Sequence, residues 1–193
     1  MEKELSEMSL EELWKLFPIF LTEHKDIWIK WFEEEKSSLE NILPQSQITR
    51  ISHIGSTSIS TIWAKPIIDI LVEISVNCCM ETIKLVLLDN GYTCMSQSEG
   101  RISFNKGYTK NGFDKKVFHL HLRYAGDNDE LYFRDYLLHN KKIALEYEKL
   151  KLKLWKKYEH DRDGYTNAKT EFIEKYTQEA KRILLTTGHH NQC

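Results

Sequence analysis

The stretch of residues 66–74, PIIDILVEI, constrains the fold of this sequence more than any other segment. It is rich in β-branched residues and almost wholly apolar, without the polar alternation of a strand that has one face in water. Such a run is typical of an interior strand in a sheet covered on both faces. Asp69 is a charge within this strand, and it is costly to bury unless it is paired, for example with Lys65, or lies at a cleft or binds a metal. The sequence therefore predicts a covered sheet that carries a carboxylate in need of a partner.

The rest of the chain supplies helices and further strands. Ser9 begins a capping-box pattern that predicts a short helix ending near Pro18, and apolar residues at helical spacing over 28–42 predict a longer helix. The other predicted elements are strands at 48–54, 92–97, 101–108 and 116–123, a helix at 81–90, and helices from Asp127 onward. We therefore predict an α+β fold in which N-terminal and C-terminal helices cover a mixed β-sheet.

Length and composition fit one main domain. The chain has 193 residues, of which 41% are hydrophobic, enough to form a core. No apolar run approaches the roughly 20 residues of a membrane span, and the acidic N-terminus lacks the features of a secretion signal. We therefore expect a cytoplasmic protein without a membrane partner, and the net charge of −2 argues against a nucleic-acid partner. The expected divisions are an N-terminal helical extension at 1–24, the main domain at 25–187 and a flexible tail at 188–193.

Positive charge is concentrated in one segment. Residues 100–125 contain six Lys and Arg residues and one acid. A cationic patch of this kind suits a small molecule that bears phosphate, although a solvated hairpin rim has the same composition. The pair Asn111-Gly112 predicts the turn of a hairpin here. That turn would place Phe104 opposite His119, and a slip of one residue would reverse these neighbours.

Two short segments carry residue types suited to a phosphate or a metal. The turn at Gly55 and Ser56 directly follows a strand and can aim backbone N–H groups and hydroxyls at a phosphate, though an ordinary capped turn has the same composition. His119 and His121 lie two residues apart in a predicted strand and so point to one face. Two imidazoles on one face suit a divalent metal or a phosphate, and Asp69 is the carboxylate expected near them.

In their order along the chain, these segments resemble the GrpB family. The resemblance rests on HIGSTS and AKPIIDI within 53–70, HLH at 119–121, FRDYL at 133–137 and YTNAK at 165–169. It covers about residues 25–185, nearly the whole chain. The family is similar in fold to the nucleotidyltransferase superfamily of DNA polymerase beta type, so the resemblance implies a sheet of that type.

The resemblance also implies roles for single residues. Gly55 and Ser56 match the pair that holds nucleotide phosphates, and Asp69 matches the first carboxylate of a metal-binding pair. The second carboxylate belongs two residues further on, where this chain has Leu71. Imidazole binds transition metals better than it binds magnesium. We therefore expect a divalent metal, which is manganese, zinc or magnesium. The expected metal ligands are Asp69, His119 and His121.

Two functions fit these features. In the first, the protein is a nucleotidyltransferase-like transferase that acts on a nucleotide or another small phosphate-bearing molecule, with Asp69 and Ser56 as catalytic residues. In the second, it is a non-catalytic ligand-binding or regulatory module that keeps the fold with an incomplete metal site. Leu71 favours the second function, and the retained carboxylate and histidines favour the first. The residues expected to bind the ligand phosphates are Gly55, Ser56, Thr57, Lys65, Arg101, Arg134 and Lys169.

Overall fold

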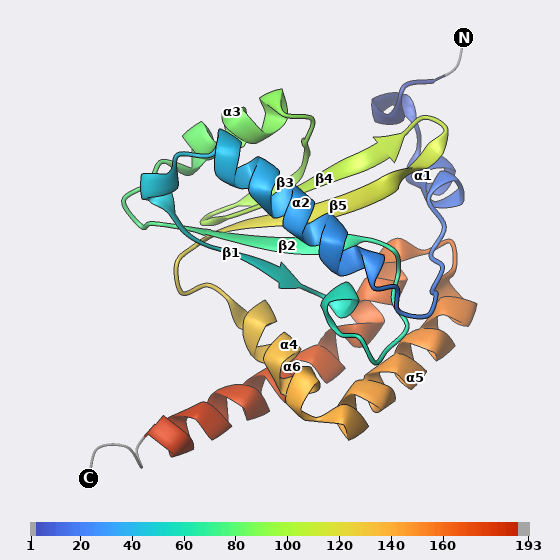
Figure 1. Ribbon diagram of the computed structural model, residues 1–193. Coiled ribbons are helices and arrows are strands. Elements are labelled where there is room, and N and C mark those ends of the chain that lie inside the picture. Colours follow the sequence, from blue (N-terminus) through green and yellow to red (C-terminus); the bar gives the residue numbers. More distant parts are fainter. Residues whose placement is uncertain (1–2, 189–193) are drawn as a thin grey trace.

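A mixed sheet of five strands forms the centre of the computed structural model, which describes residues 3–188 (Figure 1). The strands are β1 (Ile48–Ile54), β2 (Ile68–Ile74), β3 (Thr93–Ser98), β4 (Arg101–Thr109) and β5 (Gly112–Tyr124). They lie in the order β1-β2-β5-β4-β3, with β2 and β5 parallel and the other neighbours antiparallel. The apolar run at 66–74 thus forms an interior strand, as predicted.

Helices cover this sheet from both ends of the chain. They are α1 (Leu10–Leu16), α2 (Ile27–Ile42), α3 (Met80–Asp89), α4 (Asp129–His139), α5 (Lys141–Tyr158) and α6 (Arg162–Gly188), with 3-10 helices η1 (Leu5–Glu7), η2 (Gln45–Gln47) and η3 (Ser56–Ser58). The capping box predicted at Ser9 is present at the start of α1. Of the tail predicted at 188–193, Gly188 ends α6 and the remainder lies outside the described residues. Within residues 3–188, no helix is long and apolar enough to cross a membrane.

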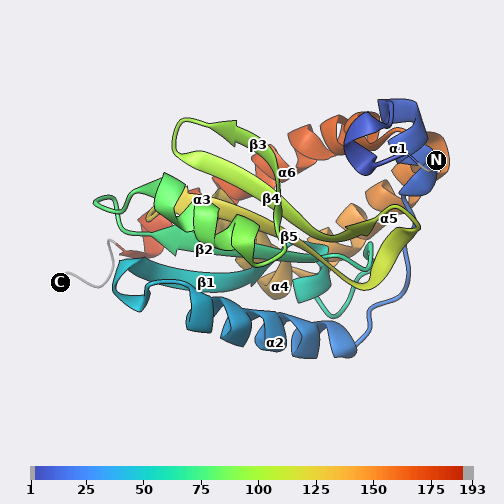
Figure 2. The ribbon, with the colours of Figure 1, turned by 90° about the horizontal axis from the view of Figure 1, so that it is seen from above.

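One face of the sheet carries the main hydrophobic core. The even-numbered apolar residues of β2, from Ile68 to Ile74, pack on this face against α2 and α3. Trp28 of α2 and Ile83 of α3 are fully buried here. Seen from above, α2 lies on one side of the sheet, and α5 and α6 lie on the other (Figure 2).

Helices α4, α5 and α6 form a layer of their own against the opposite face of β1 and β2. Leu71 of β2 packs in a small cluster with Ile54 of β1 and Leu131 of α4. Within the helical layer, the ring of Phe172 stacks on that of Tyr147 with centroids 5.3 Å apart. Phe172 is thus a packing residue of this layer. The odd-numbered residues of β2, including Asp69, therefore face the helical layer.

The segment before α2 also contacts the C-terminal helices. Ile19 lies in a buried cluster with Leu154 of α5 and Tyr165 of α6. Its backbone N–H donates to the carbonyl of Glu159 at 2.8 Å. The helical extension predicted at 1–24 thus has part of its chain packed on the main domain.

The β4–β5 hairpin forms as predicted, but its turn lies one residue earlier. Thr109 pairs with Gly112, so Lys110 and Asn111 form the turn. The Thr109 hydroxyl closes this turn, because it donates to the Gly112 carbonyl at 2.9 Å and accepts from the Asn111 backbone N–H at 3.2 Å. The predicted turn at Asn111 and Gly112 is therefore wrong.

A bulge in β5, opposite Gly107, changes the pairing of the hairpin further along. Asn105, and not Phe104, lies opposite His119. Gly107 has a φ of +87°, and a Cβ there would lie 2.2 Å from the Lys116 carbonyl oxygen. Only glycine fits this position, and the bulge that it permits shifts the register. His119 therefore has a polar neighbour in the ladder instead of the predicted phenylalanine.

Candidate functional site

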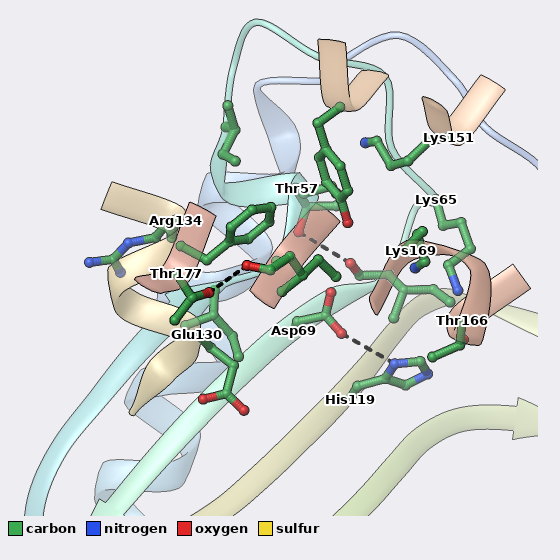
Figure 3. Close-up of a pocket in the computed structure, with 18 of the residues that line it drawn as sticks. Thr57, Lys65, Asp69, His119, Glu130, Arg134, Lys151, Thr166, Lys169 and Thr177 are labelled. Atoms are coloured by element: carbon green, nitrogen blue, oxygen red, sulfur yellow. Dashed lines mark hydrogen bonds and ion pairs between the residues drawn. The ribbon is translucent and has the colours of Figure 1, made fainter. Parts of the chain in front are cut away.

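A cavity of about 550 Å³ lies between the sheet and the layer of α4, α5 and α6 (Figure 3). The turn after β1, the strands β2 and β5, and all three helices contribute to its wall. The residues predicted from the sequence that line it are Gly55, Ser56, Thr57, Lys65, Asp69, His119, His121, Arg134 and Lys169. The fold therefore gathers nearly all of the predicted site residues around one space.

The turn after β1 brings Gly55 directly against Asp69. The pairing of β1 with β2 places Ile54 opposite Asp69, so the turn begins beside the carboxylate. Gly55 has a φ of +69°, and a Cβ at this position would lie 2.2 Å from Oδ2 of Asp69. Both the backbone conformation and the close approach therefore require glycine.

Thr57 holds this turn from the inside. Its side chain is buried, and its hydroxyl donates to the Ile67 carbonyl at 3.1 Å and accepts from Nε2 of His53 at 3.0 Å. Burial lowers the pKa of His53 to about 4, so this ring is neutral near pH 7. Arg134 of α4 donates to the His53 carbonyl at 2.8 Å. Thr57 and Arg134 thus fix the position of the turn.

Asp69 is paired with His119 across the parallel strands β2 and β5. Nδ1 of His119 lies 3.2 Å from Oδ1 of Asp69, and Nε2 lies 2.8 Å from the Tyr108 hydroxyl. Burial lowers the pKa of His119, so the ring is neutral. Since a carboxylate can only accept, we assign the proton to Nδ1, and Nε2 then accepts from the Tyr108 O–H.

The same hydrogen bond keeps Asp69 ionised. Burial alone would raise the pKa of this carboxyl, but the hydrogen bond from His119 and the nearby positive charges outweigh burial and bring the pKa to about 2. His119, rather than Lys65, is therefore the hydrogen-bonded partner of the buried carboxylate.

The predicted metal ligands do not come together as a set of three. His119 lies opposite Asp69 in the ladder, whereas His121 lies opposite Leu71. Nδ1 of His121 instead faces Nη2 of Arg123 at 3.4 Å. Within residues 3–188, no group of three or more His, Cys, Asp and Glu side chains is arranged to hold a metal ion. The divalent metal therefore stays a prediction from the sequence.

Positive side chains gather on one side of Asp69. Figure 3 shows Lys65, Lys151 and Lys169 together there, and Arg162 also lines the cavity. Burial and, to a lesser extent, the charge of Arg162 lower the pKa of Lys65 to about 8. Burial and the charges of neighbouring lysines lower the pKa of Lys151 and of Lys169 to about 7 each. These shifts mean that the three lysines share one poorly solvated region, and Arg162 lines the same cavity.

The lysines of this cluster lack carboxylate partners. Among the described residues, none of the three is within ion-pair distance of an Asp or Glu. Lys65 and Lys169 both contact the ring of Tyr165, with Nζ 5.5 Å and 4.3 Å from its centroid. Lys151 donates to the backbone carbonyl of Trp63. The positive charge that each lysine carries when protonated thus has no ion-pair partner among the described residues.

The basic hairpin makes no such contribution. Arg101 is the predicted site residue that does not line the cavity, and it pairs with Asp127 at 2.6 Å. Lys106 and Lys116 of the same hairpin pair with glutamates of α2, at 2.7 and 2.5 Å. These three charges are thus balanced by neighbouring carboxylates, and phosphate binding by this segment stays a prediction from the sequence.

Sequence reasoning missed Lys151, Arg162 and Tyr108. Lys151 had a detectable signal, because it lies four residues after Tyr147 and three before Leu154 and so falls on their apolar helical stripe. A lysine on a buried stripe needs a special environment. Arg162 and Tyr108 have no comparable signal in the sequence.

Comparison with known proteins gives the family. The model of the GrpB protein family matches residues 18–179 of this chain. The chain belongs to the GrpB family. The glutamate-rich protein GrpB of Alkalihalophilus pseudofirmus is 38% identical to it over 83% of this chain and 95% of that protein. The UPF0157 protein YqkA of Bacillus subtilis is 34% identical over 82% of this chain, which spans about half of that relative, 46%.

A solved GrpB structure has the same fold. The crystal structure of the conserved protein GrpB from Enterococcus faecalis is 31% identical, covers 86% of this chain and 99% of its own, and aligns with a TM-score of 0.73. The predicted α+β fold with a mixed sheet is therefore confirmed for this GrpB chain. A structure of the Cid1 poly(U) polymerase with Mg and 3'-dATP bound matches more distantly, at 12% identity over 76% of this chain and 49% of that one, with a TM-score of 0.47. That likeness is too weak to carry an argument about function.

Proposed function

We propose that this GrpB protein binds a nucleotide or another phosphate-bearing small molecule in the cavity beside β2. The observation that supports this most directly is the group of Lys65, Lys151, Lys169 and Arg162 near the carboxylate of Asp69, in a cavity that Asp129, Glu130 and Glu174 also line. Cations held together in a poorly solvated space repel each other unless an anion lies among them. Phosphate groups supply both the negative charge and the acceptor oxygens that such cations bind.

The size and lining of the cavity fit such a ligand. Its volume of about 550 Å³ lies within the range of about 300–1,000 Å³ found for small-molecule sites. Phe133, Tyr147 and Ile173 line part of the wall, so an apolar region lies next to the charged one. This combination suits a ligand with a planar or apolar part attached to phosphate.

Isothermal titration calorimetry with nucleoside triphosphates tests this proposal. We expect Lys169→Met to weaken binding by about tenfold or more, because it removes one of the charges that face the ligand. Lys175→Met is the matched control, since Lys175 is exposed on the same helix and does not line the cavity. Equal binding by both variants, or no binding of any phosphate-bearing ligand by the wild type, would contradict the proposal.

Transfer of a nucleotidyl or phosphoryl group is a second candidate function. Asp69 and Ser56, the catalytic residues predicted from the sequence, both border the cavity, and this favours it. Phosphorus NMR can follow a nucleoside triphosphate incubated with the protein and Mg²⁺, Mn²⁺ or Zn²⁺. Turnover by the wild type that is lost in Asp69→Asn would support transfer, whereas binding without turnover would support the non-catalytic module.

A further inference from the structure

On β2, an apolar residue stands where a second metal-binding carboxylate is expected beside Asp69. Leu71, two residues along the same face of β2, is fully buried against Ile54 and Leu131. Magnesium is held in proteins through carboxylate oxygens, and a leucine side chain offers none. On this strand a divalent ion would therefore find Asp69 alone.

Glu73, the next acid on this face of β2, cannot replace the missing carboxylate. Its Oε1 accepts from the Gly126 backbone N–H at 3.2 Å and from the Asn128 side chain at 2.9 Å. Its Oε2 forms an ion pair of 2.5 Å with Arg50. Both oxygens are thus already used to hold the edge of the sheet, and four residues of strand separate them from Asp69 by about 13 Å.

The two imidazoles have no free lone pair for a metal ion. A neutral imidazole has one N–H group and one nitrogen with an available lone pair. In His119 that nitrogen is Nε2, which accepts from the Tyr108 hydroxyl at 2.8 Å. In His121 we assign it to Nδ1, because Nη2 of Arg123 lies 3.4 Å away and a guanidinium can only donate. A metal ion would have to displace both partners.

The positive charge that a divalent ion would supply is already provided by side chains. We infer that the cavity binds a polyphosphate in its metal-free form, with Lys65, Lys151, Lys169 and Arg162 in place of the ion. This inference rests on the proposed phosphate-binding function and adds the ionic form of the ligand. A bound Mg²⁺ cancels about two negative charges of a polyphosphate. The magnesium complex is therefore attracted less to the four cations.

Calorimetric titration of the wild-type protein with inorganic tripolyphosphate tests the inference. The titration is carried out in EDTA and in excess Mg²⁺, with the ionic strength made equal by NaCl because salt screens these contacts. We expect binding in EDTA with a Kd about tenfold smaller than in Mg²⁺. A smaller Kd in Mg²⁺ than in EDTA would overturn the inference and leave the proposed function standing. An absence of binding in both buffers would refute the proposed function as well.

The same titration with Mn²⁺ and with Zn²⁺ distinguishes this inference from the metal site predicted at Asp69, His119 and His121. Metal-free binding predicts that neither ion decreases the Kd of tripolyphosphate. A decrease with either ion that is lost in His121→Ala would overturn the inference in favour of the predicted metal site.

Two substitutions test the roles of the side chains. Leu71→Asp adds the missing carboxylate and should make Mg²⁺ strengthen binding instead of weakening it. Because this change buries a charge and can unfold the protein, Lys169→Met gives a second test. It should increase the Kd in EDTA by about tenfold, while Lys175→Met should not. Wild-type affinity of Lys169→Met in EDTA would overturn the inference.

A third comparison separates a free polyphosphate from a nucleotide as the ligand. Similar Kd values for tripolyphosphate and ATP in EDTA would identify the phosphate chain as the part that is bound, and a smaller value for ATP would add a contribution from the base. Both outcomes agree with the inference. Adenosine that binds as tightly as ATP would overturn it, because the four cations would then contribute nothing.

Discussion

At the scale of single residues, Gly55 shows how closely the candidate site is built into the fold. Gly55→Ala should lose stability for two reasons, the positive φ of +69° and the Cβ that would lie 2.2 Å from Asp69. Gly91→Ala is the control, because Gly91 has a φ of +84° but no atom within 4 Å of its Cβ position. The control should lose about 1–2 kcal/mol from the backbone alone.

Urea denaturation measures both losses. We expect the larger loss in Gly55→Ala, together with loss of phosphate binding, while Gly91→Ala binds as the wild type does. Equal losses of stability, or retained binding in Gly55→Ala, would mean that the turn can move away from the carboxylate without effect.

The sequence predicts the polar residues of the candidate site better than it predicts their hydrogen-bond partners. The alternation of β5 correctly places His119 and His121 on one face, and the buried strand correctly marks Asp69 as a charge that needs a partner. The partner itself, His119, depends on the parallel pairing of β2 with β5, which joins segments about 50 residues apart and leaves no local pattern. The role of Thr57 inside the turn likewise depends on the distant Ile67 carbonyl.

At the scale of elements, α5 carries a lysine whose burial makes the stability of the protein depend on pH. The pKa of Lys151 falls from 10.5 to about 7 on burial. Between these values the unfolded chain binds more protons than the folded one, so the stability of the ligand-free protein rises with pH. The contribution of this lysine to the free energy of unfolding is complete above the pKa of the unfolded chain, and it is lost as the pH falls toward 7. Its slope is at most about 1.4 kcal/mol per pH unit for one lysine.

Urea midpoints between pH 7 and pH 9 test this dependence. Lys151→Met should show a flatter increase with pH than the wild type. Lys153→Met, at an exposed position of the same helix, should keep the wild-type slope. An unchanged slope in Lys151→Met would show that this ammonium group is better solvated than its position indicates.

Most elements are predictable from local patterns, and the failures have local causes. The periodicity of 28–42 and the capping box at Ser9 give α2 and α1 nearly at their observed bounds. The hairpin turn lies one residue before the predicted position because the Thr109 hydroxyl closes it there. The Asn-Gly dipeptide is a strong turn signal and predicts the later position. The bulge opposite Gly107 shifts the register for a reason that the sequence does not specify, since a glycine in a strand can mark a bulge, a bend or a close contact.

At the scale of the whole molecule, the cavity joins the sheet to the layer of α4, α5 and α6. A ligand that contacts η3, α5 and α6 at once should therefore strengthen the connection between the two layers. Tripolyphosphate at about 100 times its Kd should raise the free energy of unfolding by about 2.7 kcal/mol. Hydrogen exchange should slow in η3, α5 and α6, where the ligand is bound, and change less in α3, which lies on the other face of the sheet.

Hydrogen–deuterium exchange with mass spectrometry measures this pattern, and Lys169→Met should remove it. Protection confined to the β4–β5 hairpin would contradict the assignment, because it would place the anion near Arg101 and away from the cavity. The comparison therefore tests the site and the outer hairpin in one experiment.

The two faces of β2 tie the position of the carboxylate to the packing of the protein. Even-numbered residues of this strand fill the core beneath α2 and α3, and Asp69 projects from the other face into the cavity. A slip of one residue would exchange the faces and bury the charge beside Trp28 and Ile83. A descendant of this sequence can thus lose Asp69 through a single substitution, but it cannot relocate the carboxylate by sliding the strand without dismantling the core. The position of the carboxylate is therefore kept for as long as the packing of the core is kept.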